Sequence, residues 1–145
     1  MIRLVSVDPD NWRPGLKVRK DQEDFVADSA GILARAYAYR DFRSQAFIIY
    51  SDETPVGMAM YHDWEEGDAY AFSQLFIDER YQGRGYGYEA SSEIVDMLKR
   101  DGKYDKISLC YIEGDEPARR LYEKLGFTHT GEQDDDEIIM EMILR

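Results

Sequence analysis

The sequence of 145 residues contains little that would tie it to disulfide chemistry, membranes or nucleic acid. Its single cysteine, Cys110, cannot form a disulfide within the chain, which fits a reducing cytoplasm. It lacks both an apolar run of about 18 residues and a basic-then-apolar start, so we expect neither a membrane span nor a signal peptide. With 18 basic and 30 acidic residues, the formal net charge of −12 disfavours phosphate backbones and favours a small cationic partner.

Histidine is also scarce. His62 and His129 are far apart and have few neighbours able to bind a metal, so we expect no metal site. The sequence contains no internal repeat, low-complexity tract or linker. The chain has 145 residues, of which 43% are hydrophobic, and this is enough to bury a core. We therefore expect one domain over residues 1–145.

The hydrophobic pattern predicts a mixed α/β fold. A helical period that begins at Phe25 and Val26 continues to Tyr37, and further helices are expected after Gly87 and around Tyr122. The acidic run 132–137 is expected to be a solvated loop between the last strands. Strands are expected at 2–7, 46–50, 56–61 and 70–77, near residue 107, and at 137–144.

The most informative segment is Gln82-Gly83-Arg84-Gly85-Tyr86-Gly87, which lies between a predicted strand and a predicted helix. Glycines let the backbone approach a guest closely, and the first N–H groups of a helix attract anions. A dinucleotide-binding G-x-G-x-x-G turn fails because Tyr88 occupies its last position, and no Gly-Lys-Ser or Gly-Lys-Thr of a P-loop occurs. The segment predicts a site for another pyrophosphate; an ordinary helix-capping turn is the alternative.

A second motif begins at Asp115, which is a suitable N-cap for a helix. Pro117 suits the first turn and Gly126 suits the position just past the end. Tyr122 lies on the apolar face and is either a functional residue or a core tyrosine with its hydroxyl satisfied. The apolar face, which we expect to be buried, consists of Ala118, Leu121, Tyr122 and Leu125.

Together, the Q-x-x-G-x-G pattern and the later helix, which ends at Gly126-Phe127, resemble the GNAT superfamily of N-acetyltransferases. Asp115 stands where an asparagine is usual. The resemblance covers essentially the whole chain and implies the GNAT fold: a central mixed, mostly antiparallel sheet flanked by helices. In that fold a coenzyme A turn lies between the fourth strand and the following helix. The segments 10–18 and 22–27, with Ala36-Tyr37, look most like the small bacterial spermine/spermidine acetyltransferases.

The resemblance implies acetyl-coenzyme A as co-substrate and a primary amine as acceptor. An alkylammonium has a pKa of about 10.4 and must lose a proton before it attacks the thioester. By the family pattern, Tyr122 is the general acid that protonates the departing thiolate. The implied cofactor-binding residues are Leu75, Phe76, Ile77, Gln82, Gly83, Arg84, Gly85, Tyr86, Gly87, Asp115 and Ala118.

The general base is left open. Ser73 and Gln74 occupy the positions before the turn where some related enzymes carry a carboxylate, so water or another segment must serve. Asp63-Trp64 resembles an acid-plus-tryptophan pair found near polyamines, and a tryptophan face attracts cations; a half-buried hairpin tip is the alternative. The candidate acceptor-side residues, including the two glutamates considered as bases, are Glu23, Asp63, Trp64 and Glu113.

Four functions compete on this evidence. A cytoplasmic polyamine (spermine/spermidine) N-acetyltransferase comes first, and an acetyltransferase for another amine, such as a protein N-terminus, a lysine or a drug, comes second. The third is a non-catalytic regulator that binds acyl-coenzyme A, and the fourth, a nucleotide-binding domain, is disfavoured by the motif mismatches. The apolar run Ile138-Ile139-Met140 fits burial in either a core or a homodimer interface.

Overall fold

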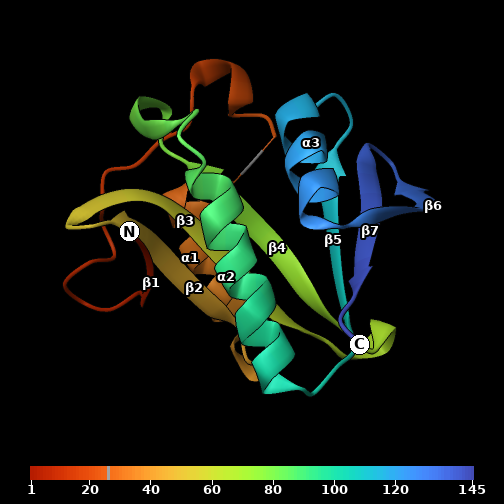
Figure 1. The fold of residues 1–145 in the computed structure, drawn as a ribbon. Helices are drawn as coiled ribbons and strands as arrows, with labels where there is room; N and C mark the ends of the chain where they lie inside the picture. Colours follow the sequence, from red (N-terminus) through yellow and green to blue (C-terminus); the bar gives the residue numbers. More distant parts are fainter. Residues whose placement is uncertain (26) are drawn as a thin grey trace.

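The computed structural model describes residues 1–25 and 27–145, and within them seven strands form one sheet in the order β1-β2-β3-β4-β5-β7-β6 (Figure 1). Neighbouring strands are antiparallel except β4 and β5, which are parallel. The expected mixed, mostly antiparallel sheet is therefore confirmed. The strands are β1 (Ile2–Ser6), β2 (Gln45–Ser51), β3 (Thr54–Trp64), β4 (Ala69–Ile77), β5 (Lys106–Ile112), β6 (Thr128–Asp134) and β7 (Glu137–Ile143).

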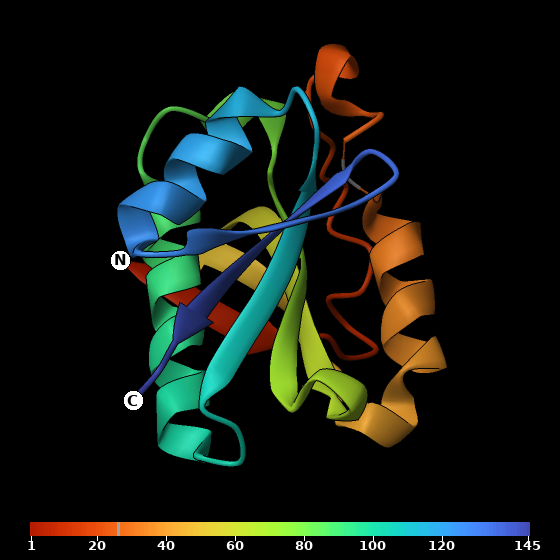
Figure 2. The same cartoon turned by 90° about the vertical axis from the view of Figure 1, so that its right-hand side faces the viewer.

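Helices cover both faces of the sheet. Helix α1 (Ser29–Ala38) lies on one face, and α2 (Tyr86–Asp101) and α3 (Glu116–Leu125) lie on the other (Figure 2). No helix in the described ranges is long and apolar enough to cross a bilayer. Four short 3-10 turns complete the chain: η1 (Lys20–Gln22), η2 (Arg40–Phe42), η3 (Glu65–Gly67) and η4 (Glu79–Tyr81).

Two hydrophobic clusters fill the space between the helices and the sheet. The larger cluster packs α2 and α3 against one face and includes Tyr70, Ile94 and Ile107, each fully buried. The smaller cluster packs α1 against the other face through Ile32 and Met58. Because both faces are apolar, the central strands read as nearly continuous hydrophobic runs.

Two expected elements differ from the structure. Helix α1 begins at Ser29, not at Phe25, because the Asp28 carboxylate accepts a 2.7 Å hydrogen bond from the N–H of Gly31 and caps the helix there. Phe25 lies in a turn, and Val26 lies outside the described residues. Strand β6 was not expected; it pairs with β7, and the acidic run 132–137 spans its end, a two-residue turn and the first residue of β7.

Strands β4 and β5 part soon after they meet. The only cross-strand pairs between them in the described residues are Tyr70 with Ile107 and Ala71 with Ser108. On its other side β4 has a bulge, because Met60 pairs with Gln74 while Tyr61 pairs with Phe72, which leaves Ser73 as the extra residue. Since bulges increase local twist, this one turns the carboxyl half of β4 away from β5. A split opens within the sheet.

A buried carboxylate fixes the end of β4. The side chain of Asp78 has no exposed surface and accepts hydrogen bonds from the N–H of Lys17 (2.9 Å) and from both the N–H and the guanidinium of Arg80. Burial alone would raise the pKa of Asp78, but the hydrogen bonds from Arg80 and Lys17 lower it below the usual value. Asp78 therefore joins the N-terminal segment to the sheet.

We predict that Asp78→Ala lowers the free energy of unfolding by about 2–4 kcal/mol, because two N–H groups and a guanidinium lose a charged acceptor. Since folding lowers the pKa of Asp78, its contribution is complete above the unfolded pKa of about 3.9 and is lost as the pH falls through the folded value. Urea unfolding between pH 2 and pH 7 measures the difference. Asp96→Ala, on the exposed face of α2, is the control, and equal effects of the two changes would contradict the assignment.

Candidate active site

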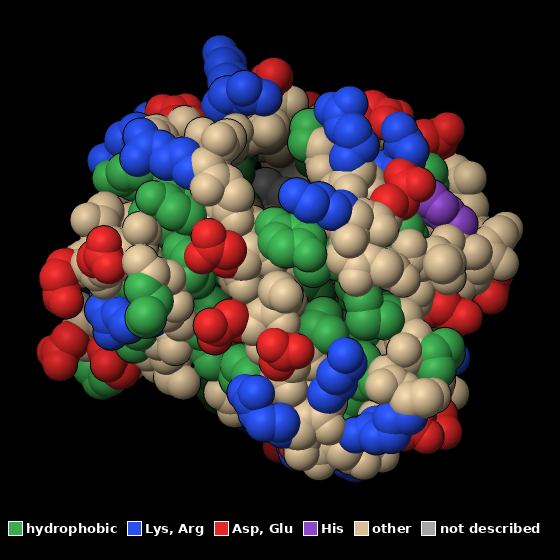
Figure 3. Space-filling model, in the orientation of Figure 1, with side chains coloured by type: hydrophobic (Ala, Val, Ile, Leu, Met, Phe, Trp, Pro, Cys, Tyr) green, Lys and Arg blue, Asp and Glu red, His purple; other side chains and the backbone are tan. Residues whose placement is uncertain are grey.

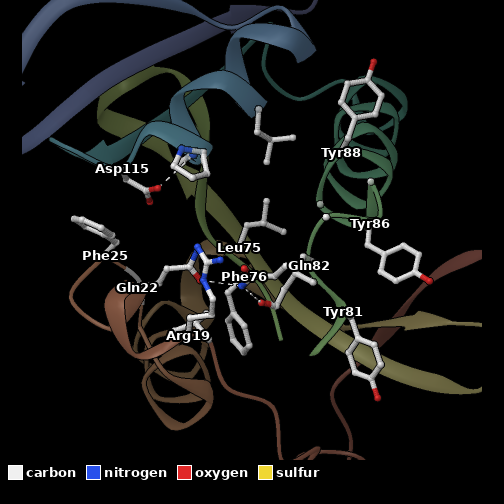
Figure 4. Close-up of a pocket in the computed structure, with 18 of the residues that line it drawn as sticks. Arg19, Gln22, Phe25, Leu75, Phe76, Tyr81, Gln82, Tyr86, Tyr88 and Asp115 are labelled. Atoms are coloured by element: carbon white, nitrogen blue, oxygen red, sulfur yellow. Dashed lines mark hydrogen bonds between the residues drawn. The ribbon is translucent and has the colours of Figure 1, made fainter. Parts of the chain in front are cut away.

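A cavity of about 350 Å³, here called the turn cavity, lies where the end of β4 meets the beginnings of α2 and α3. Leu75, Phe76 and Ile77 of β4 form its floor. One side is formed by Gln82, Gly83 and residues 85–88 (Figure 4). Figure 3 shows Lys and Arg side chains gathered around the hollow between these elements. Two cations that line the cavity are Arg19 and Lys124.

The N-terminus of α2 faces this cavity without a side-chain cap. Asp28 caps α1 and Asp115 caps α3, each with a carboxylate that accepts an N–H of the first turn. Helix α2, the longest of the three, has Gly85 at its N-cap position, and glycine has no side chain that could accept an N–H. Gly83 and Gly85 have φ angles of +79° and +82°, which favour glycine. Unpaired amides at the positive end of the helix dipole are suited to an anion.

The N-terminal segment forms the opposite wall. The side-chain amide of Gln82 donates hydrogen bonds to the carbonyl of Ile77 (2.9 Å) and to the side-chain oxygen of Gln22 (2.8 Å), so the first residue of the turn holds this segment (Figure 4). Phe25 lines the cavity as well, and the N–H of Ala27 donates to the side chain of Gln74 on β4 at 3.3 Å. Hydrogen bonds therefore connect the N-terminal segment to both the glycine-rich turn and strand β4.

A second cavity of about 260 Å³, the inner cavity, lies on the other side of the split between β4 and β5. Tyr122 borders both cavities and is the residue of α3 whose side chain is buried. Its ring makes edge contacts with Phe72 and Phe127, which fix its position. The residues common to the two cavities are Phe25, Leu75, Asp115, Ala118 and Tyr122.

Burial controls the ionisation of the groups at this junction. It raises the pKa of Tyr122 far above the ordinary value, and the nearby Asp115 carboxylate adds to the effect. Burial also raises the pKa of Asp115, although the hydrogen bond from the N–H of Ala118 opposes this. Partial desolvation and the neighbouring Glu137 carboxylate raise the pKa of Cys110 to about 11. Both the phenol and the thiol are therefore protonated at neutral pH.

The structure brings together the residues that the sequence indicated for the cofactor, with one exception. Leu75, Phe76, Ile77, Gln82, Gly83, Gly85, Tyr86, Gly87, Asp115 and Ala118 all line the turn cavity. Arg84 is exposed and is absent from the described lining; its guanidinium lies 5.7 Å from the ring centre of Tyr81. Arg19 lines the cavity instead, and no local pattern in the sequence singled it out.

The four expected acceptor-side residues do not lie together. Asp63 is buried and accepts hydrogen bonds from Arg43 at 2.7 Å and Lys103 at 2.9 Å, so two cations already neutralise it. Trp64 is 42% exposed. Glu23 borders a separate cavity beside Leu16 and Phe76, and Glu113 is exposed and accepts a hydrogen bond from Gln133. Within the described lining, none of the four borders the inner cavity.

Sequence reasoning did not single out two residues that do border the inner cavity. Cys110, on β5, was treated as an ordinary strand residue, and Glu137 was assigned to a solvated acidic loop. Glu137 instead begins β7 and pairs with Ile112 of β5. A signal was available, because Glu137 comes directly before the apolar run of β7, but its facing strand could not be read from the sequence.

The chain was compared with known proteins. The model of the acetyltransferase (GNAT) family matches residues 5–127. The spermine/spermidine N(1)-acetyltransferase of Bacillus subtilis (strain 168) is 35% identical over 92 residues, 59% of this chain and 60% of that protein. The L-methionine sulfoximine/L-methionine sulfone acetyltransferase of Salmonella typhimurium is 30% identical over 91 residues, 59% of this chain and 52% of that protein. The matched region thus spans between half and two thirds of each relative.

The fold agrees with a solved structure over nearly the whole chain. Spermidine N-acetyltransferase from Vibrio cholerae, crystallised in complex with CoA and spermine, aligns with a TM-score of 0.78 at 15% identity. The alignment covers 99% of this chain and 95% of that one. The similarity confirms the architecture that the resemblance implied.

The two glycines at the start of α2 differ in a way that can be measured. Gly85→Ala should lower the free energy of unfolding by about 1–2 kcal/mol, because its positive φ strains any residue with a Cβ. Gly87→Ala should be neutral or raise it by up to about 1 kcal/mol, because Gly87 is helical and a Cβ there would make ordinary 3.7 Å contacts with Ile77 and Leu121. Urea unfolding of both variants tests this; the same sign for both would show that the turn has another conformation.

Proposed function

Because the chain belongs to the acetyltransferase (GNAT) family, we propose that residues 1–145 form a single domain that transfers an acetyl group from acetyl-coenzyme A to a primary amine. One observation carries the proposal: Tyr122 borders two cavities, one at the amide-rich start of α2 and one across the split in the sheet. A transferase needs two substrates to meet at such a junction.

Acetyl-coenzyme A is proposed to occupy the turn cavity. Its diphosphate suits the uncapped amides of residues 83–88, and Arg19 and Lys124 supply positive charge at the same cavity. Its pantetheine arm suits the mostly apolar floor of Leu75, Phe76 and Ile77. Asp115 and Ala118 border the end of the cavity that joins the inner one, where the thioester has to lie.

Tyr122 is proposed to act as the general acid. Attack by the neutral amine on the thioester carbonyl forms an oxyanion, for which a backbone N–H at the end of β4 is a suitable donor. The carbon–sulfur bond then breaks, the departing thiolate takes the phenol proton, and the surplus N–H proton of the acetylated nitrogen restores the phenol. Because burial keeps the Tyr122 phenol protonated at neutral pH, the proton is present when the thiolate leaves.

The acceptor is proposed to be a polyamine of the spermine/spermidine type. The Bacillus subtilis relative carries that activity in its name, and the net charge of −12 favours an approaching polycation. A small zwitterionic amine is the second candidate, because the Salmonella typhimurium relative is named for amino-acid analogues. The inner cavity, which contains both acidic side chains and Arg35, is compatible with either.

A Tyr122→Phe variant should lower kcat by at least about tenfold, because general acid catalysis typically contributes about 10²–10⁴-fold. Its affinity for acetyl-coenzyme A should be unchanged. Single-turnover release of free thiol measures the rate, and calorimetry measures binding. Tyr104→Phe, another buried tyrosine outside the described cavity linings, is the control; wild-type turnover by Tyr122→Phe when chemistry is rate-limiting would refute the role.

Replacing Gly87 by valine should abolish measurable binding of acetyl-coenzyme A, because a branched side chain would enter the turn cavity at the amides. The variant should still fold, since Gly87 is helical and its Cβ direction is not crowded. Isothermal titration calorimetry compares it with Glu93→Val on the exposed side of the same helix. Equal affinity in the two variants would count against a cofactor at this turn.

The function itself is tested by assaying the chain with acetyl-coenzyme A and a panel of amines. The panel contains spermine, spermidine, methionine sulfoximine, lysine and an N-terminal peptide. Preference for the polyamines supports the proposed acceptor, and preference for methionine sulfoximine would favour the second candidate. Tight binding of acetyl-coenzyme A without turnover on any amine would contradict catalysis.

A further inference from the structure

The inner cavity shares part of its lining with a larger one. This outer cavity, of about 560 Å³, lies between α1 and the β6–β7 hairpin, whose tip points to the side of the sheet where α1 lies (Figure 2). Five residues line both the inner and the outer cavity: Arg35, Ser73, Gln74, Cys110 and Glu137. A molecule that enters from solvent through the outer cavity therefore passes these five side chains before it reaches Tyr122.

Glu137 is the carboxylate in this passage. Two other acids border the inner cavity, but Asp115 accepts the N–H of Ala118 as the cap of α3, and Asp24 lies exposed in a turn. Glu137 lies on β7, which is paired with β5 along seven residues from Lys106 to Ile112. A strand inside a sheet holds a side chain more firmly than a turn does, so Glu137 is the best positioned of the three.

Glu137 has few partners in this passage: the Cys110 thiol lies beside its carboxylate, and Arg35 lines the same two cavities. The Glu137 carboxylate has no ion pair within the described residues, whereas Glu141 on the same strand lies 3.8 Å from Lys106. The hydroxyl oxygen of Ser73, at the bulge in β4, is buried and has no hydrogen-bond partner there. A buried hydroxyl without a partner is costly and suggests a missing guest. An anion and an unused hydroxyl on one passage suit an ammonium group, which has only donors.

We infer that Glu137 is the carboxylate that binds the ammonium group of the acceptor and takes its proton. The inference rests on the proposed function and supplies the general base that Ser73 and Gln74 cannot provide. One N–H proton passes to the Glu137 carboxylate, and the freed nitrogen lone pair forms the bond to the acetyl carbon. The carbon–sulfur bond breaks, and the thiolate takes a proton from Tyr122. The acetylated nitrogen then loses its second surplus proton, which restores the Tyr122 phenol, and Glu137 returns the first proton to water. The ligand class is a primary alkylammonium.

The test compares Glu137→Gln with Glu137→Asp and with Asp136→Asn in single turnovers with spermidine between about pH 6 and pH 9. The Asp136→Asn substitution removes one negative charge, as Glu137→Gln does, but at the neighbouring residue. Asp136 is outside the described lining of both cavities. Calorimetry with acetyl-coenzyme A verifies that each variant folds and binds its first substrate. The charged and titratable groups that share a cavity with Glu137 are Asp24, Arg35, Cys110, Tyr111, Asp115, Tyr122, Glu132, Asp134 and, further along the outer cavity, Tyr39, His62, Lys106 and Glu141.

We expect Glu137→Gln to lower the rate at least about 100-fold at pH 7, Glu137→Asp to retain part of it, and Asp136→Asn to stay within about twofold of the wild type. Without a base, the rate of Glu137→Gln should rise about tenfold per pH unit, because deprotonated amine must come from solution. A wild-type rate for Glu137→Gln, or a loss confined to KM with an unchanged pH profile, would overturn the inference. Failure of the wild type to acetylate any amine would refute the proposed function instead.

Discussion

The early separation of β4 from β5 is the constraint on which the rest of the structure depends. After two paired residues on each strand, the ladder stops, and a bulge at Ser73 turns β4 away. In a continuous ladder, the next strand would cover the backbone groups and side chains of the carboxyl half of β4. Here they border two cavities that meet at Tyr122. If β4 and β5 were paired along their full length, the two cavities could not meet between them.

The N-termini of the three helices are capped in two different ways. Asp28 and Asp115 each accept one N–H of the first turn of α1 and α3, so both of these helix starts carry a side-chain cap. The glycine-rich start of α2 is not completed by a side chain, and it faces the turn cavity. The positive charge of Arg19 and Lys124 lies on the same cavity, although the chain as a whole carries a net charge of −12. The charge of these two side chains at the turn cavity is therefore opposite in sign to the net charge of the chain.

Local signals in the sequence predicted most of the fold and pointed to most of the residues that line the turn cavity. The Gly83–Gly87 turn, the Asp115 cap and the stop at Gly126 depend on neighbouring residues alone, and all were found. Strand β6 was missed because most of its side chains are exposed and Gly131 interrupts its pattern. Contacts distant in sequence were also missed. Asp63 pairs with Arg43 and Lys103, 20 and 40 residues away. Glu137 pairs with Ile112 and lies beside Cys110 only because β7 folds back on β5.

The central claim is that main-chain amides at the start of α2 hold the diphosphate of acetyl-coenzyme A beside the split strands. A crystal structure of the protein grown with that co-substrate tests this most directly. The account predicts phosphate oxygens within about 2.7–3.2 Å of the amides of residues 83–88, and the thioester at the junction bordered by Tyr122. A diphosphate bound away from α2, or a thioester remote from Tyr122, would contradict it.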